Sequence, residues 1–205
     1  MNATFKTVML WMSILVVIFL AWHFAQIQKK ETPKKFSEFM AMVEAGEVSV
    51  VQPCAGISEL TVEDARAEGP IGKRFLEQQQ SVSEPVFFKG DASEWARAGI
   101  EAVFAQAKMG RDASKPALRI KVEEIFAEET VYRRAEFDGR VVLSAEVVPA
   151  GGGAACWSTR IDGFAENYGY AGNALNHEET LNHALDRAVL KLLSSDLQSK
   201  LCSGC

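Results

Sequence analysis

The clearest structural signal in the chain is Leu181-Asn-His-Ala-Leu-Asp-Arg-Ala-Val-Leu-Lys-Leu-Leu193. Its apolar residues recur at intervals of three and four, which places them on one face of a helix. Asn176 and Glu179 are expected to cap the start of this helix. A helix with one wholly apolar face has to bury that face against a second layer of structure.

Strands upstream of this helix are expected to provide that second layer. Residues 117–127 and 140–148 alternate between apolar and polar side chains, as half-buried strands do, with a turn predicted at Asp138-Gly139. A capping box at Asp91 and Glu94 predicts a second helix. The fold class predicted is α+β, one globular domain with helices packed on one face of a mainly antiparallel sheet. Three further strands are predicted at residues 57–62, 86–88 and 154–161.

Residues 7–28 form a run of 22 residues without a charged side chain. At about 1.5 Å per residue this run would make a helix of roughly 33 Å, long enough to cross a bilayer. The anchor residues are predicted to be Trp11, Leu15, Phe19 and Trp22, with the indoles near the two interfaces. A cleaved signal peptide is the alternative, but cleavage after residue 25 would put a histidine where a small residue is needed. An uncleaved single-pass anchor is therefore expected.

The predicted organisation has four parts: a tail at 1–6, a transmembrane helix at 7–28, a basic linker at 29–35 and a folded domain at 36–205. The chain carries 22 Lys+Arg against 27 Asp+Glu, and five of the lysines lie before residue 36. The folded domain is therefore strongly acidic. An acidic surface argues against nucleic acid as a partner, because the phosphate backbone needs a basic face.

The orientation in the membrane is open. Four lysines follow the apolar run and one precedes it, so the positive-inside rule places the folded domain in the cytoplasm. The cysteines favour the opposite side. Their number is even and all follow the anchor, as disulfides in an oxidising compartment would allow: Cys54, Cys156, Cys202 and Cys205.

Two segments, Lys6-Thr-Val-Met-Leu-Trp11 and Phe36-Ser-Glu-Phe-Met-Ala-Met-Val-Glu-Ala-Gly-Glu-Val-Ser-Val-Val51, flank this apolar run. Together, residues 5–51 resemble the N-terminus of FtsH-type membrane proteases, in which a first membrane helix leads into a small extracytoplasmic α/β domain. The resemblance implies that the folded domain lies outside the cytoplasm. It also implies association with such a protease as one possible role.

The catalytic motifs of those proteases are absent from the sequence. Gly151-Gly-Gly153 is followed by no lysine, so no phosphate-binding loop of the form GxxxxGK[ST] is present. His177 and His183 are six residues apart, whereas a zinc-binding HExxH motif needs a spacing of four. We therefore expect no catalytic site, no metal and no cofactor, and hence a protein that is not an enzyme.

The remainder, residues 56–201, is weakly similar to YajG-like bacterial envelope lipoproteins. The similarity is carried by Leu60-Thr-Val-Glu-Asp-Ala-Arg66 with Ile71-Gly72, by Leu118-Arg-Ile-Lys-Val122 and by residues 179–189. Pro53 stands before Cys54 where a lipoprotein signal has a small residue, so a membrane helix would replace the lipid anchor. The family has no established activity that would transfer to this chain.

The most conspicuous candidate site is Cys202-Ser-Gly-Cys205. A CxxC pair can exchange disulfides when its first thiol lies at a helix N-terminus, but this pair follows the end of a helix. A structural disulfide is expected, either between 202 and 205 or from one of them to Cys54 or Cys156. Tyr168 and Tyr170, in a predicted loop over residues 164–172, are candidates for a partner contact.

Three pairs of charged residues are expected to be structural. Glu123-Glu124 and Glu128-Glu129 should each present one solvated and one edge carboxylate, because neighbours on a strand point to opposite faces. Asp64 and Arg66 should form a local ion pair.

The sequence thus predicts a non-catalytic interaction module in the bacterial inner membrane, single-pass, with its body in the periplasm or outside. Its predicted partners are the membrane and a protein such as a membrane protease or an envelope complex. Two alternatives stay open: an envelope protein that binds lipid or peptide, and a thiol oxidoreductase that uses Cys202 and Cys205.

Overall fold

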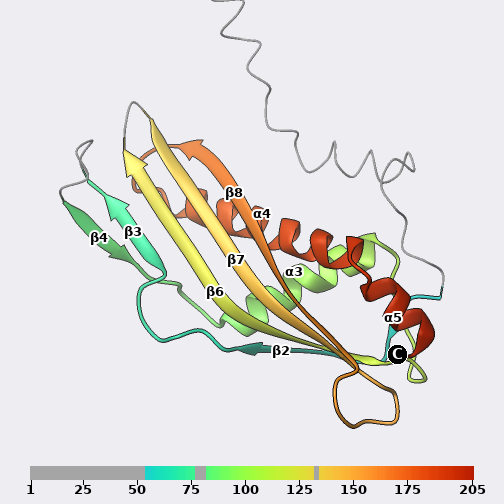
Figure 1. Cartoon of the computed structure of the whole chain (residues 1–205). Helices are drawn as coiled ribbons and strands as arrows, with labels where there is room; N and C mark the ends of the chain where they lie inside the picture. Colours follow the sequence, from blue (N-terminus) through green and yellow to red (C-terminus); the bar gives the residue numbers. More distant parts are fainter. Residues whose placement is uncertain (1–53, 77–81, 132–133) are drawn as a thin grey trace, which may run out of the picture. The chain divides into compact units, whose positions relative to one another are not determined.

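A computed structural model of the chain describes residues 54–76, 82–131 and 134–205. All of them belong to one compact unit, Val50–Cys205. This unit has two layers, a twisted sheet and a layer of helices on one of its faces (Figure 1). The described part of the chain therefore confirms the predicted α+β class with a mainly antiparallel sheet.

Three long antiparallel strands form the centre of the sheet: β6 (Ala117–Val131), β7 (Ala135–Val148) and β8 (Trp157–Gly169). Two short strands pair in parallel with the other side of β6. They are β2 (Leu60–Asp64), along residues 118–122, and β3 (Gly72–Phe75), along residues 127–129. β4 (Ser83–Val86) runs antiparallel to β3, and a separate two-stranded sheet joins β1 (Gly56–Ile57) to β5 (Gly110–Arg111).

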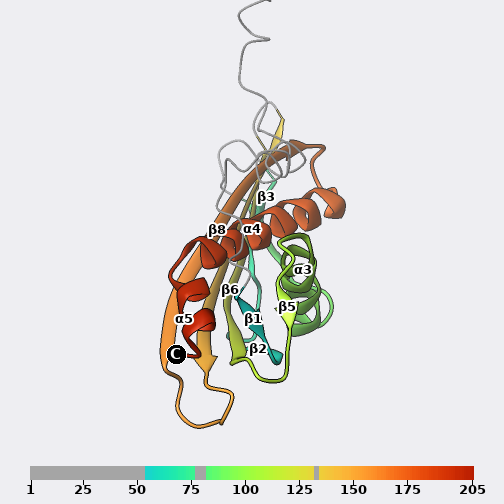
Figure 2. The ribbon, with the colours of Figure 1, turned by 90° about the vertical axis from the view of Figure 1, so that its right-hand side faces the viewer.

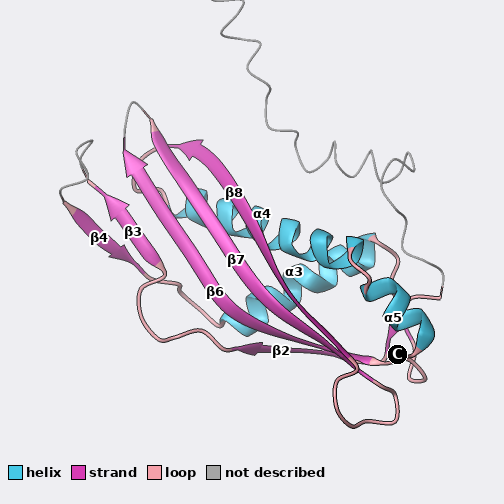
Figure 3. Cartoon of the chain, in the orientation of Figure 1, coloured by secondary structure: helices cyan, strands magenta, loops and turns pink. Residues whose placement is uncertain are grey.

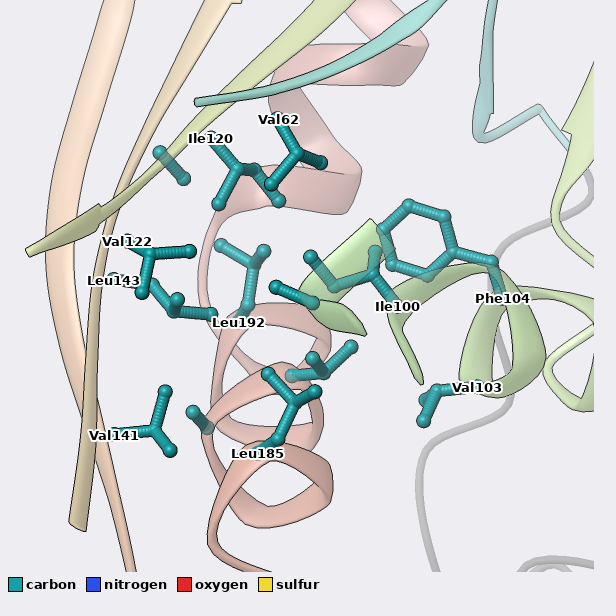
Figure 4. Packing of buried hydrophobic residues seen from close by; sticks show 14 of the residues in the cluster. Val62, Ile100, Val103, Phe104, Ile120, Val122, Val141, Leu143, Leu185 and Leu192 are labelled. Carbon is teal, nitrogen blue, oxygen red and sulfur yellow. The ribbon is translucent and has the colours of Figure 1, made fainter. Parts of the chain in front are cut away.

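The helices described are α3 (Ala92–Gln106), α4 (Ala174–Ser194) and α5 (Leu197–Ser203). They lie on the same side of the long strands, as the views in Figures 2 and 3 show. The predicted apolar face of α4 is buried against the sheet, with Leu185 and Leu192 at its centre. Figure 4 shows Leu192 between the sheet residues Val122 and Leu143 and Ile100 of α3.

The caps of the two long helices differ in how well the sequence predicts them. Asp91 caps α3 as predicted, because its carboxylate accepts hydrogen bonds from the backbone N–H groups of Ser93 and Glu94. The predicted cap of α4 at Asn176 and Glu179 is wrong: the N-cap is Asn173. Both predicted residues lie inside the helix, where Glu179 accepts a hydrogen bond from Asn167 of β8.

The predicted turn at Asp138-Gly139 is also wrong, since both residues lie inside β7. Gly139 faces α4, and a Cβ at this position would come within 2.9 Å of the Thr180 side chain. Glycine at this position allows α4 to approach the strand closely. A local sequence pattern cannot distinguish a glycine required for such an approach from a glycine in a turn. The strands consequently extend past residue 138 to a hairpin near Arg134.

A similar close approach explains why β8 is longer than the predicted strand over residues 154–161. A Cβ at Gly163 would overlap the Ala184 carbonyl oxygen, so α4 crosses β8 directly over this glycine. The strand continues to Gly169, and most of the loop predicted over residues 164–172 is strand. In the same way, the strand predicted over residues 57–62 is two strands, β1 and β2, and β3 falls in a stretch for which no strand is predicted.

The predicted membrane helix at 7–28, with Trp11, Leu15, Phe19 and Trp22, lies outside the described residues. So do the linker at 29–35 and the segment 36–51. Within the described residues, none of the helices has the length and apolar character that crossing a bilayer requires.

Candidate interaction surface

The sheet has one face turned to the helices and one face on which no described element packs. Phe137 and Gly139 of β7 face α4, because Phe137 touches His177 and Gly139 lies against Thr180. Strand residues alternate between faces, so Glu136 and Asp138 point to the opposite side. We call this side the open face; it is the near face of the long strands in Figure 1.

The open face carries a row of carboxylates near the β6–β7 hairpin. Glu128, Asp138 and Glu166 lie opposite one another on β6, β7 and β8, and Glu136 is two residues before Asp138. Lys73 of β3 stands beside Glu128 at the edge of this row. We call these four carboxylates the acidic row.

Burial and the neighbouring carboxylates both act on the Asp138 carboxyl of the acidic row. Burial, together with the charges of Glu136, Glu166 and Glu128, raises the pKa of its carboxyl to about 6. One of its oxygens is buried and, among the described residues, has no hydrogen-bond partner. Negative charge therefore prevails in the row, and a basic group beside Asp138 would stabilise its ionised carboxylate.

Tyr168 and Tyr170 lie next to the acidic row, at the same end of the sheet. Tyr168 is 57% exposed, and its hydroxyl donates a hydrogen bond to Glu136 over 3.2 Å. Tyr170 is 86% exposed in the connection between β8 and α4, and Leu175 in the first turn of α4 is 69% exposed. An open hollow of about 520 Å³ has both tyrosines in its wall; its lining residues are Val131, Arg134, Ala135, Tyr168, Gly169, Tyr170 and Ala171.

A buried carboxylate holds this end of the domain together. Glu129 of β6 is fully buried, and its carboxylate accepts a 2.7 Å hydrogen bond from the backbone N–H of Gly172. Arg74 of β3 and His177 of α4 each place a nitrogen 3.2 Å from the same carboxylate. Glu129 thus joins two strands, the β8–α4 connection and the start of α4, and this group is called the Glu129 cluster below.

Glycine is required where the connection passes the Glu129 cluster. Gly172 has φ of 73°, in the left-handed region, and a Cβ there would lie 2.6 Å from an Arg74 nitrogen. Asn176 steadies the same turn by donating a hydrogen bond to the Tyr170 carbonyl oxygen over 3.3 Å. The backbone on both sides of Tyr170 is therefore fixed, although its side chain is exposed.

Sequence reasoning missed the Glu129 cluster. Alternation correctly places Glu128 and Glu129 on opposite faces, but Glu129 is fully buried and is not an edge carboxylate. Its partners Arg74 and His177 lie 55 positions before it and 48 positions after it in the sequence, so no local pattern links them.

Two other carboxylates of the predicted charged pairs also have side-chain partners. Glu123 bonds to Ser144 and Arg160 on the open face. Asp64 and Arg66 form the predicted ion pair, with 2.8 Å between their side chains.

The cysteines lie at the other end of β7 and β8. Cys54 is bonded to Cys202, and Cys156 to Cys205, so the alternative of a bond between 202 and 205 is not the one observed. Within the described ranges, no group of His, Cys, Asp and Glu side chains could hold a metal ion.

The fold and this surface define a class: a disulfide-bonded α+β domain in which the described helices cover one face of a mainly antiparallel sheet. No family model matches the chain, and no curated protein is similar to it by sequence. The resemblance of residues 5–51 to FtsH-type proteases is therefore without support from a family match.

Several solved structures are similar in part. A protein of family DUF330 from Xanthomonas campestris is 12% identical over 75% of this chain and 90% of that chain, with a TM-score of 0.42. A Caulobacter crescentus protein with a provisional lipoprotein description is 18% identical over 57% and 87%, with a TM-score of 0.41. A minor lipoprotein from Acinetobacter baumannii is 9% identical over 70% and 94%, with a TM-score of 0.38. Structural similarity at this level gives no information about the function of this chain.

Proposed function

We propose that this chain is a non-catalytic, membrane-anchored protein of the bacterial envelope whose folded domain binds a protein partner. The surface proposed for the contact is the end of the sheet with Tyr168, Tyr170 and the acidic row. The observation that carries the proposal is Tyr170, a large side chain 86% exposed on a backbone that buried groups hold in place.

A tyrosine on a fixed backbone is suited to binding, because it offers a large contact area and has few rotatable bonds to order when it is covered. The charge of the surface specifies the partner further. Four carboxylates beside the tyrosines favour a partner that presents Lys or Arg around an apolar contact. The salt dependence of binding would follow from this complementarity.

The location in the envelope is supported by two features of the chain. Two disulfides suit an oxidising compartment, and the uncharged run at 7–28 suits an anchor. The narrower proposal, an FtsH-type protease as the partner, has only the resemblance of residues 5–51 behind it.

The two alternatives find less support. A lipid or peptide between helix and sheet would need space there, but α4 lies directly on Gly139 and Gly163. A thiol oxidoreductase would need Cys202 and Cys205 as a pair, yet each is bonded to a distant cysteine.

Site-specific photo-crosslinking of the full chain in its native membranes tests the proposal. A benzophenone side chain replaces Tyr168 or Tyr170 in turn, and Phe87, which is 63% exposed after β4, serves as the control position. We expect one discrete adduct from positions 168 and 170, absent from position 87 and weakened by salt. Equal adducts from all three positions, or none from the tyrosine positions, would overturn the proposal.

A further inference from the structure

Each of the two disulfides has one of its cysteines in the same short segment, residues 202–205. Cys202 is bonded to Cys54 across 148 residues, and Cys205, three positions later, is bonded to Cys156 across 49 residues. Figure 1 shows α5 and the marked C-terminus next to the loop between β7 and β8, which carries Cys156. The sulfur atoms of all four cysteines are therefore gathered around the end of α5.

The backbone of this segment is already folded into a tight turn. Gly204 has φ of 74°, and the Cys205 N–H donates a 2.9 Å hydrogen bond to the Lys200 carbonyl oxygen. This is the Schellman arrangement that ends many helices, and it folds Cys205 back toward the last turn of α5. Cys205 itself has φ of 49°, a left-handed conformation that is unfavourable for a residue other than glycine.

The two disulfides differ in exposure. Cys156 and Cys205 are both exposed, whereas Cys202 is half-buried and only its partner Cys54 is exposed. A reductant in solution therefore reaches the Cys156–Cys205 bond more readily. Thiolates released at Cys205 would then be separated from Cys202 by only two residues.

We infer that the Cys202–Cys205 segment is a redox relay, in which reduction of the exposed disulfide passes to the second one by internal exchange. This inference goes beyond the proposed function and does not depend on it. The reductant it requires is a protein or small molecule with two thiols.

The proposed thiol–disulfide exchange takes place in three steps. A thiolate of the dithiol attacks Sγ of Cys156, and Cys205 leaves as a thiolate. The second thiol of the reductant attacks the mixed disulfide, which frees the Cys156 thiol and leaves the reductant oxidised. The Cys205 thiolate then attacks Sγ of Cys202, and Cys54 leaves as a thiolate that takes a proton from water. Two electrons pass from the reductant to the protein, which retains one disulfide, Cys202–Cys205.

The consequence lies at the start of the folded domain. Cys54 lies two residues before the start of β1, and its bond to Cys202 links this point of the chain to α5. Leu197 and Leu201 of α5 are fully buried, so the helix stays packed when the bond opens. The relay would therefore remove the covalent link between α5 and the start of the described domain.

Two matched variants of the full chain test the relay, because each removes the same disulfide. C156S leaves a thiol at Cys205, beside Cys202, and C205S leaves a thiol at Cys156. Free thiols are alkylated after incubation at mildly alkaline pH without reductant. We expect about ten-fold more alkylated Cys54 in C156S, since a thiolate tethered so close acts at a high effective concentration. Equal alkylation of Cys54 in both variants would overturn the relay.

A second measurement uses the unaltered chain, in case either variant fails to fold. The protein is treated with increasing amounts of a dithiol, quenched with acid, alkylated and digested with trypsin. Cleavage after Lys200 releases residues 201–205, which hold both cysteines of the relay. Partial reduction should yield this peptide unalkylated and internally bonded, with Cys54 and Cys156 alkylated. If Cys156 and Cys205 are alkylated while Cys54–Cys202 persists, the inference is wrong.

Discussion

At the scale of single residues, Glu129 is the side chain whose loss should cost most. The variant Glu129→Ala leaves Arg74 and His177 beside an empty buried position and removes the acceptor for the Gly172 N–H. Removing one partner of a buried ion pair typically costs about 3–5 kcal/mol, and Arg74 is partly exposed, so we expect about 2–4 kcal/mol. Urea denaturation measures this loss.

Its neighbour Glu128 provides the control. Glu128→Ala changes the same type of side chain on the open face, where the lost charge relieves repulsion within the acidic row. Its free energy of unfolding should stay within about 0.5 kcal/mol of the original. If the two variants were equally stable, Glu129 would not hold this end of the domain together.

The raised pKa of Asp138 implies that its contribution to the stability of the folded domain falls as the pH rises. Its pKa is raised from 3.8 to about 6, so the folded chain binds a proton more tightly than the unfolded chain does. Ionising this carboxyl therefore removes stability as the pH rises from about 4 to 6, and the loss is complete above that window. Asp138→Asn should stabilise the domain at pH 7 by about 1 kcal/mol, a figure discounted for solvent screening.

Thermal unfolding of the Asp138→Asn variant and the original chain across pH 4 to 7 measures this difference. The comparison is made between the two proteins at each pH, because Asp64 and Glu123 have lowered pKa values and respond in the opposite direction. The stability gain should fall to a small fraction of its pH 7 value near pH 4, where Asp138 is protonated in the folded chain and only about half ionised in the unfolded chain. A gain that is constant with pH would contradict the assignment.

At the scale of elements, the docking of α4 on the sheet depends on glycines in the strands. Gly163→Ala would place a methyl group against the Ala184 carbonyl and the backbone N of Ala188. Overpacking against rigid backbone should cost about 2–3 kcal/mol. Gly151→Ala, where a Cβ would meet nothing within 4 Å, is the matched control and should be close to neutral. Equal unfolding midpoints in urea would show that α4 can move away at no cost.

The same glycines mark the limit of what the sequence predicts. Periodicity is sufficient for the buried face of α4 and for the long central strands, because each signal lies within one element. Gly139 and Gly163 are required by contacts with a helix 20 or more residues away in sequence. Local rules assign such a glycine to a turn. The predicted strand at 140–148 is therefore shorter than β7, and part of β8 lies in what is predicted as the 164–172 loop.

Among the site residues, the exposed tyrosines stand out in the sequence because they lie between glycines. The Glu129 cluster and the disulfide pairing cannot be predicted in this way. Both depend on which elements become neighbours after the sheet has formed, and four cysteines allow three pairings. The parallel pairing of β3 with β6 is such a long-range event, and it is what brings Arg74 to Glu129.

At the scale of the whole molecule, the two disulfides should contribute unequally to stability. In the chain-entropy model, a disulfide stabilises by restricting the unfolded chain, more strongly as the closed loop grows longer. The loops span 148 and 49 residues. The logarithmic dependence on length then makes the Cys54–Cys202 bond about 1 kcal/mol more stabilising than the Cys156–Cys205 bond.

Two double variants separate the contributions without leaving a free thiol at either site. C54S/C202S should unfold at a lower urea concentration than C156S/C205S, and each should lose about 3–5 kcal/mol relative to the original chain. Equal losses, or the reverse order, would mean that contacts in the folded state outweigh loop length. The order bears on the relay as well: if Cys54–Cys202 contributes more, its opening weakens the domain more than the initial reduction of the exposed bond does.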